Sequence, residues 1–231
     1  MRPHWCDGDV IRFPILFEDG EALVIDKPTG LPLDRPRAGG ECLEEHLDDL
    51  RLGFQRAPWP VHRLDRDTSG CLLLARNPKA LKRFAAAFEA RLVEKRYLGA
   101  IAGGLAADSG TIELALTKIS SAEAGWRMIP AKKGKPAITH WTKLAEIGGR
   151  TLIEFRPQTG RTHQIRVHAL HGLGTALLGD PIYGDGSDAE RTMLHAAGLV
   201  VHRECKPPIA ATAPLPADFA ALGFESALND G

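Results

Sequence analysis

Residues 62–75 of this chain read His62-Arg63-Leu64-Asp65-Arg66-Asp67-Thr68-Ser69-Gly70 and continue directly into Cys71-Leu72-Leu73-Leu74-Ala75. The first nine residues hold two carboxylates, two guanidiniums, an imidazole and two hydroxyls, and the last five are apolar. A short apolar run of this kind is typical of a buried strand. Charges that lead into a buried strand are costly unless they are paired. The segment is therefore either a salt-bridged surface turn or a place where a reactive group is held and tuned.

The segments around this stretch carry clear local signals. Residues 15–27 predict a hairpin, with two strands joined by a turn at Asp19-Gly20. Residues 41–52 have helical composition. Asn77 and Pro78 are favoured at the N-cap and the first position of a helix, so a helix is expected to follow them. Its apolar stripe, at three- and four-residue spacing, consists of Leu81, Phe84, Ala85, Phe88 and Leu92.

The second half of the chain is richer in strand patterns. Residues 97–102 predict one strand, residues 138–155 predict two strands joined at Gly148-Gly149, and residues 199–201 predict a late strand. Thr162 is expected to cap a helix that runs to about His171 and stops at Gly172. Hairpins interrupted by a few helices indicate an α+β fold, with a mixed, mainly antiparallel β-sheet flanked by helices.

The composition is that of an ordinary globular protein, with 44% hydrophobic and 25% charged residues in a chain of 231. Without repeats or linkers, a single domain is expected over residues 15–222, between an N-terminal extension, 1–14, and a C-terminal tail, 223–231. No stretch approaches the roughly 20 apolar residues that span a bilayer, and no signal-peptide core is present. The scattered cysteines predict neither a zinc site nor disulfides and favour a cytoplasmic location. They are Cys6, Cys42, Cys71 and Cys205.

Residues 62–70 resemble the catalytic signature of the RluA-type pseudouridine synthases, His-Arg-Leu-Asp-x-x-Thr-Ser-Gly. Further blocks resemble the other motifs of this family, in the same order along the chain. They are Val24-Ile25-Asp26-Lys27-Pro28-Thr29-Gly30-Leu31, Glu94-Lys95-Arg96-Tyr97-Leu98-Gly99, Gly160-Arg161-Thr162-His163-Gln164-Ile165-Arg166-Val167-His168 and Leu178-Gly179-Asp180-Pro181-Ile182-Tyr183-Gly184. The resemblance runs from about residue 16 to about residue 219. It implies the pseudouridine synthase fold and an isomerase that breaks the N1–C1′ bond of an RNA uridine, turns the base and rejoins it through C5, without a cofactor.

The resemblance assigns three catalytic residues. Asp65 takes the place of the essential aspartate, and whether it attacks C1′, attacks C6 or assists glycal formation stays open. Arg161, at a strand-to-helix corner, is expected to grip this carboxylate bidentately, or else to bind phosphate or serve structure alone. Tyr97 matches the tyrosine near the target base, where stacking contributes about 1–3 kcal/mol; the alternative is a strand tyrosine packed in the core.

A second set of residues is assigned to RNA or substrate binding. These residues are Arg63, His62, Ile165, Lys132, Lys133, Lys135 and Arg166. Arg63 matches an arginine that lies near the flipped nucleotide in relatives, whereas a hydrogen-bonded structural role is favoured for His62. The lysines form a local basic cluster that either contacts phosphates or is a solvated face. The cluster matters because 29 basic and 29 acidic residues leave a formal net charge of zero, whereas an RNA binder is expected to be basic.

Other features suggest no further site. His163, His168, His171 and His195 lack the spacing of metal ligands, so no metal is expected. Gly179-Asp180-Pro181 and Gly184-Asp185-Gly186 predict turns. With the first strand near residue 15, the chain resembles short family members without an N-terminal RNA-binding domain.

The expected partner is tRNA or ribosomal RNA, bound by a monomer with no membrane and no obligate protein partner. Asp34-Arg35 and Val201-His202-Arg203-Glu204-Cys205 depart from the family pattern outside its core motifs. Glycoside hydrolysis is a competing enzyme class, but Asp65 and Asp67 are poorly placed in the sequence for its two carboxylate roles. The other alternative is a non-catalytic RNA-binding module derived from the same fold.

Overall fold

The computed structural model describes residues 6–7, 10–11, 13–36, 39–121 and 125–225, and divides into two compact units. Unit 1 comprises Met1–Glu94 and Ala196–Pro214, and unit 2 comprises Lys95–His195 and Leu215–Gly231. The chain changes unit inside two strands, β7 (Val93–Ala102) and β13 (Leu194–Arg203).

Besides part of β13, unit 1 contains β3 (Ile15–Glu18), β4 (Ala22–Lys27), β5 (Trp59–Pro60), β6 (Ser69–Ala75) and β14 (Lys206–Thr212), with a separate pair formed by β1 (Cys6–Asp7) and β2 (Val10–Ile11). In its sheet, β4 lies between β3 and β6, β13 adjoins β6, and β14 pairs with β13. The predicted hairpin is confirmed, because β3 and β4 pair antiparallel and the Asp19 carboxylate accepts hydrogen bonds from the backbone N–H groups of Glu21 and Ala22. All seven residues of β6 are buried, as its apolar run predicts.

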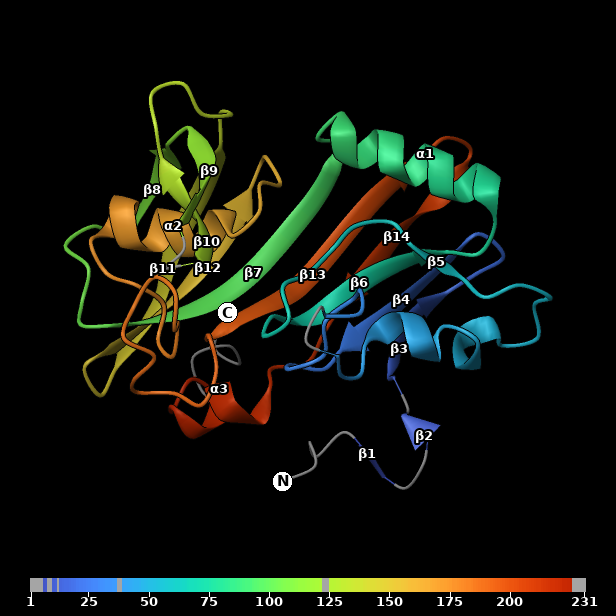
Figure 1. The fold of residues 1–231 in the computed structure, drawn as a ribbon, viewed down its shortest axis with the longest axis horizontal. Coiled ribbons are helices and arrows are strands. Elements are labelled where there is room, and N and C mark those ends of the chain that lie inside the picture. The colour runs from blue at the N-terminus through green and yellow to red at the C-terminus, as the bar shows by residue number, and fades with distance from the viewer. Residues whose placement is uncertain (1–5, 8–9, 12, 37–38, 122–124, 226–231) are drawn as a thin grey trace. The chain divides into compact units, whose positions relative to one another are not determined.

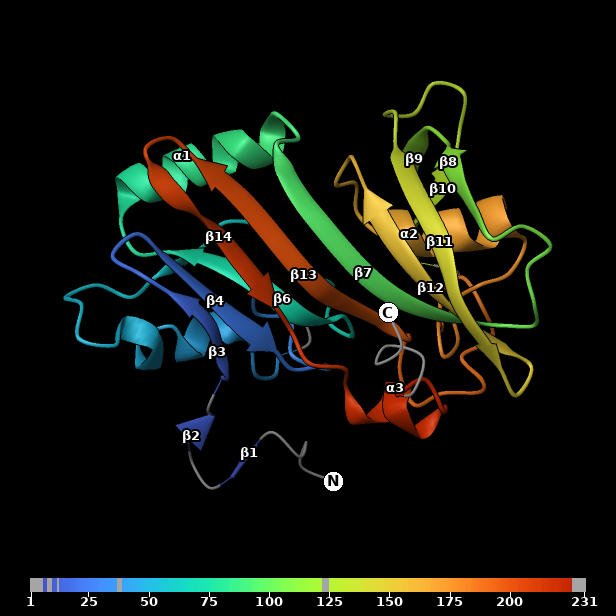
Figure 2. The same cartoon turned by 180° about the vertical axis from the view of Figure 1, so that it is seen from behind.

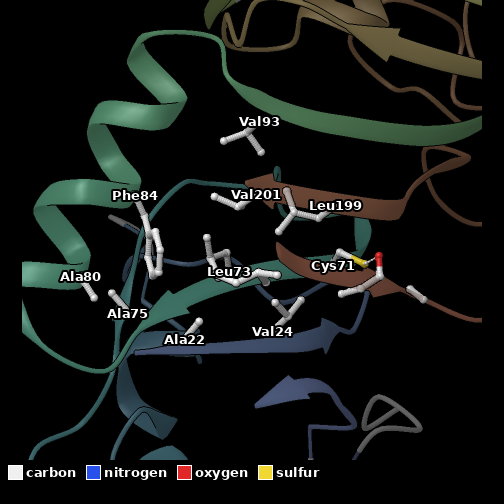
Figure 3. Close-up of a cluster of buried hydrophobic side chains, with 13 residues drawn as sticks. Ala22, Val24, Cys71, Leu73, Ala75, Ala80, Phe84, Val93, Leu199 and Val201 are labelled. Carbon is white, nitrogen blue, oxygen red and sulfur yellow. Dashed lines mark hydrogen bonds between the residues drawn. The ribbon is translucent and has the colours of Figure 1, made fainter. Parts of the chain in front are cut away.

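Helix α1 (Pro78–Glu89) covers one face of this sheet (Figure 1). The predicted cap is confirmed, since the Asn77 side chain accepts a hydrogen bond of 2.8 Å from the backbone N–H of Ala80. Phe84 packs into an apolar cluster with Leu73 and Val201 (Figure 3). The predicted apolar stripe is wrong at two positions. Ala85 is exposed, and Leu92, which is 65% exposed, follows the end of the helix.

The helix expected over residues 41–52 is replaced by two short 3-10 helices, η1 (Leu43–His46) and η2 (Asp49–Arg51). Cys42 provides no side-chain cap, and the backbone N–H of Leu43 instead donates to the carbonyl of Pro32. Leu43 and Leu50 are buried, so tertiary anchoring outweighs the helical propensity of this segment.

Unit 2 contains a second run of antiparallel strands, in the order β7–β12–β11–β8, and a separate hairpin of β9 and β10. The bounds are β8 (Ser109–Glu113), β9 (Leu116–Ser121), β10 (Gly125–Pro130), β11 (Ile138–Ile147) and β12 (Arg150–Pro157). The predicted turn at Gly148-Gly149 is confirmed, because both residues have positive φ angles, 57° and 71°, as a two-residue hairpin turn requires.

Helix α2 (Gln164–His168) crosses one face of these strands (Figure 2) and continues as a π-helical turn, η3 (Ala169–Leu173). The predicted cap at Thr162 is wrong, because the N-cap is His163, in a left-handed conformation with φ of 51°. The predicted stop at Gly172 is wrong too, because the π-helical turn runs to Leu173 and Gly174 is its C-cap. A Cβ atom on Gly172 would lie 2.7 Å from Ile112, so this glycine allows close packing instead.

Gln164, the first residue of α2, is hydrogen-bonded to the segment that precedes the helix. The buried Gln164 side chain accepts hydrogen bonds from the backbone N–H of Arg161 and the hydroxyl of Thr159, and it donates to the carbonyl of Ile138. This side chain therefore organises the corner that leads into α2. A last helix, α3 (Ala217–Ala221), completes unit 2, and none of the helices in the described residues is long and apolar enough to cross a membrane.

Candidate active site

Asp65 lies half-buried at the start of a turn in unit 1. The backbone N–H of Thr68 donates to the Asp65 carbonyl at 3.1 Å, which closes the turn. Thr68 and Ser69 are buried directly after it, at 3% and 6% exposure. Gly70 has a φ of +105°, and a Cβ atom there would lie 2.3 Å from the Ala196 carbonyl oxygen, so only glycine fits. The residues after Asp65 thus hold its turn firmly against β6.

A second turn, residues 28–31 at the end of β4, is hydrogen-bonded to the Asp65 loop. The backbone N–H of Gly30 donates to the Arg66 carbonyl at 2.9 Å, and the Arg66 side chain donates back to the Gly30 carbonyl at 3.2 Å. The Thr29 hydroxyl donates to the Asp67 carbonyl at 2.9 Å. The family motif near the N-terminus therefore supports the motif that carries Asp65.

The other charged residues of the loop make weaker contacts. Asp67 lies 3.9 Å from Arg66, a long contact between oppositely charged side chains. Arg63 is exposed and lies 3.9 Å from the equally exposed Asp34. Pairs of this kind contribute little to stability, so Arg63 can reorient toward a ligand at small cost.

His62 accepts a hydrogen bond of 3.0 Å at Nε2 from the backbone N–H of Leu73. Its ring stacks on Phe88, with the ring centres 4.6 Å apart. His62 thus ties the start of the loop to β6 and α1, which is the hydrogen-bonded role expected for it.

Tyr97 lies on β7, opposite Phe155 of β12, and belongs to unit 2. Its side chain is half-buried and packs against the apolar cluster that contains Ile101 and Ile165. Ile165 itself is only 6% exposed. The structure thus leaves Tyr97 partly exposed and Ile165 buried.

The two arginines of the block at residues 160–168, Arg161 and Arg166, differ sharply in their surroundings. Arg161 is half-buried, and its Nε donates to the Pro136 carbonyl at 3.2 Å. Arg166 is buried and grips Asp180 bidentately, with both N–O distances at 2.7 Å. Arg161 does not lie at the start of the helix, because α2 begins at Gln164 and has only five residues.

Asp180 was expected only as a turn residue, yet it is a fully buried ion-pair partner, at 1% exposure. Burial tends to raise the pKa of this carboxyl, but the Arg166 guanidinium and the backbone N–H groups of Ile182 and Tyr183 outweigh that effect and lower it. The only sequence signal for this role of Asp180 was its position in the family-like block at residues 178–184, which follows the block that contains Arg166.

A basic and aromatic surface lies on unit 2. The turn that follows β10 carries Lys132, Lys133 and Lys135, all exposed, and it is bound to β9 by two backbone hydrogen bonds between Lys135 and Leu116. Trp126 on β10 is 43% exposed, with the Lys118 ammonium 4.8 Å from its ring centre and the His163 ring 4.8 Å away. This basic hairpin, β9, β10 and residues 131–135, presents cations beside an aromatic ring.

The buried His168 predicts a pH-dependent stability. Burial lowers the pKa of its imidazole from 6.5 to about 4, against a raising effect of the Leu114 backbone. As the pH falls, the His168 imidazole is protonated first in the unfolded chain. Its contribution to the free energy of unfolding is therefore fully present above pH 6.5 and is lost as the pH falls toward 4. We expect a loss of about 2 kcal/mol between pH 7.5 and pH 5, measured by urea unfolding. His168→Gln should remove that part of the pH dependence, whereas His202→Gln, at an exposed site, should keep it; an unchanged slope in His168→Gln would contradict the assignment.

The comparisons with known proteins agree with this arrangement of motifs. A family model described as RNA pseudouridylate synthase matches residues 21–171. The chain belongs to the RNA pseudouridylate synthase family. The resemblance to the RluA-type pseudouridine synthases is thereby confirmed, and the chain is an isomerase that acts on uridine in RNA.

Relatives of this pseudouridylate synthase are similar over most of its length. It is 53% identical over 212 residues to an uncharacterized RNA pseudouridine synthase of Zymomonas mobilis, covering 91% of this chain and 97% of that protein. It is 34% identical over 203 residues to ribosomal large subunit pseudouridine synthase D of the same organism, covering 84% of this chain and 63% of that protein.

The fold is also shared with solved structures. Human RNA Pseudouridylate Synthase Domain Containing 4 has a TM-score of 0.74 at 23% identity, over 93% of this chain and 92% of that chain. The predicted α+β pseudouridine synthase fold is therefore confirmed. Within the described part of this pseudouridylate synthase, no group of three or more His, Cys, Asp or Glu side chains is arranged to hold a metal ion.

Proposed function

We propose that this chain converts specific uridines of ribosomal or transfer RNA to pseudouridine, with Asp65 as the essential carboxylate. The observation that carries the proposal is the half-buried Asp65 at the head of a turn whose following residues are locked into β6. A fixed carboxylate can meet the sugar or base of a flipped uridine without reorganising. In the reaction the N1–C1′ bond breaks, a C5–C1′ bond forms, C5 loses its proton and N1 gains one, so no atom is added.

The supporting roles follow the motifs. We assign Tyr97 to stacking on the target base and Arg161 to holding the carboxylate or the adjacent phosphate. His62, Arg63, Ile165 and Arg166 complete the proposed substrate contacts. RNA of the large ribosomal subunit is the first substrate to test, because one relative is named a ribosomal large subunit pseudouridine synthase. A monomer that acts in the cytoplasm without a protein partner is the simplest form of this proposal.

The test uses transcripts labelled with tritium at uridine C5, made separately for large-subunit RNA, small-subunit RNA and tRNAs. We expect the wild-type protein to release tritium from at least one class and to leave pseudouridine in it. Free uracil as a product would indicate glycosidic hydrolysis instead. Binding without release from any class would overturn the enzyme proposal in favour of an RNA-binding module.

We further propose that the basic hairpin binds RNA. Its lysines supply phosphate contacts, and Trp126 supplies the kind of aromatic ring on which unpaired bases stack. The net charge of the chain is zero and does not by itself indicate RNA binding. The lysines of the basic hairpin, however, lie close together, and a local cluster of cations can attract phosphates.

Removing Lys132, Lys133 and Lys135 together, each as Ala, should weaken RNA binding about 10- to 100-fold at low salt. The salt dependence should also become shallower, by about 0.7 in the log–log slope per lost phosphate contact on single strands. Filter binding at several salt concentrations measures both quantities. The matched control changes Lys79 and Lys82, both exposed on α1 of unit 1, to Ala. An equal loss in this control would show that the basic hairpin has no special role.

A further inference from the structure

Lys27, the last residue of β4, is fully buried, at 0% exposure. Lysine is almost never fully buried unless its charge is partnered, because desolvating an ammonium is costly. The Lys27 ammonium donates to the carbonyl oxygens of Pro28 at 2.7 Å, Leu31 at 2.9 Å and Arg66 at 3.1 Å. These three acceptors match the three N–H donors of an ammonium.

The three carbonyls belong to two different segments. Pro28 and Leu31 lie at the two ends of the turn that follows β4, whereas Arg66 immediately follows Asp65. The Arg66 carbonyl also accepts the backbone N–H of Gly30, so two donors hold this peptide group. In the sheet, Lys27 of β4 is paired with Gly70 of β6, at the other end of the Asp65 loop. One buried cation thus spans the turn and the loop that carries the essential carboxylate.

We propose that Lys27 is a positioning residue for Asp65, which acts by holding the Arg66 carbonyl against turn 28–31 and so sets the orientation of the Asp65 turn. This inference rests on the proposed function of Asp65. An ammonium suits the task because its charge strengthens all three hydrogen bonds in a site closed to water. The Thr29 hydroxyl, which donates to the Asp67 carbonyl, reinforces the same clamp from its other side.

The test compares Lys27→Met with Arg203→Met, a matched control in unit 1. Arg203 is also a buried cation, with its side chain 5% exposed, and it also donates to a backbone carbonyl, that of Pro207. We expect Lys27→Met to lower kcat for tritium release about 100-fold, since small misplacements of a catalytic group have effects of that size, while the RNA Kd stays within about 2-fold. Arg203→Met should lose stability with its kcat unchanged. Equal kcat values in the two folded variants would overturn the positioning role.

Thr29 keeps the proposal testable if Lys27→Met does not fold. Thr29→Val removes one hydrogen bond of the clamp and should lower kcat about 3- to 10-fold, whereas Thr29→Ser should restore it. Hydrogen exchange of the Thr68 amide, which closes the Asp65 turn, should be faster in Thr29→Val than in Thr29→Ser. Wild-type rates and wild-type exchange in Thr29→Val would overturn the inference.

The same assays separate this inference from the proposed function. If the wild type releases tritium, Asp65→Asn is inactive and Lys27→Met is fully active, only the positioning role fails. If the wild type releases none from any RNA, the proposed function fails, and the Thr68 exchange rates still decide whether Lys27 and Thr29 hold the loop.

Discussion

Asp65→Asn is expected to lower the rate of tritium release at least about a thousandfold while leaving folding and RNA binding intact. The amide has nearly the shape of the carboxylate, so the half-buried position and the turn closed by Thr68 should be kept. The negative charge and the nucleophilic oxygen are lost, and each proposed course of the reaction needs one of them. Single-turnover assays at saturating RNA measure the chemical step, and filter binding measures affinity.

The matched control is Asp67→Asn, two residues further along the same loop. The Asp67 carboxylate lies 3.9 Å from Arg66, and the link between Asp67 and Thr29 uses the backbone carbonyl of Asp67, which the substitution keeps. Asp67→Asn should therefore retain activity within a few-fold. Equal inactivity of both variants would mean that the loop, and not Asp65 itself, had been damaged, and an active Asp65→Asn would reject the proposed mechanism.

Arg166→Met is expected to cost about 3–5 kcal/mol of unfolding free energy, because it leaves the Asp180 carboxylate buried without its bidentate partner. Asp180 is 1% exposed, so water cannot replace the guanidinium. Urea unfolding at pH 7 measures the loss. The double variant Arg166→Met with Asp180→Asn should recover much of it, since no uncompensated charge then remains.

Arg161→Met is the control for this experiment. Arg161 is half-buried and donates to a single backbone carbonyl, so its loss should cost about 1 kcal/mol or less. A small effect of Arg166→Met, or a large effect of Arg161→Met, would contradict the structural contrast between the two arginines.

Activity of the same variants shows which arginine supports the chemistry. If Arg161→Met folds and loses tritium release, the role assigned to Arg161 is supported. If Arg161→Met is active and the charge-conserving Arg166→Lys is not, the role passes to Arg166. Asp180 gives the Arg166 guanidinium a fixed orientation, the preorganisation that a catalytic group needs.

Local chemistry explains why some elements were predictable. The Asn77 cap, the hairpin at Asp19 and the glycine turn at Gly148-Gly149 each depend on hydrogen bonds or φ angles within a few residues. The burial of β6 follows from its continuous apolar run. Signals of this range are present in the sequence before the chain folds.

Two features could not be predicted because their causes are distant in sequence. Thr162 does not cap α2, and the corner before the helix is organised instead by hydrogen bonds of Gln164 with Thr159 and Ile138. In segment 41–52 the backbone N–H of Leu43 donates to the Pro32 carbonyl, and two short 3-10 helices form in place of the expected helix. Local propensity is weak compared with such tertiary contacts.

The sequence by itself determined the family, the α+β class and the order of the motifs, because these depend on residue types at fixed spacing along the chain. Only the tertiary structure decided that Lys27 is buried against the Arg66 carbonyl and that Arg166 is held by Asp180. Lysine and arginine side chains are ordinarily exposed. Lys27 and Arg166 are buried here because segments 39 and 14 residues away in the sequence cover them and provide their hydrogen-bond acceptors. Burial and partner choice are properties of the packed chain, so no pattern of neighbouring residues contains them.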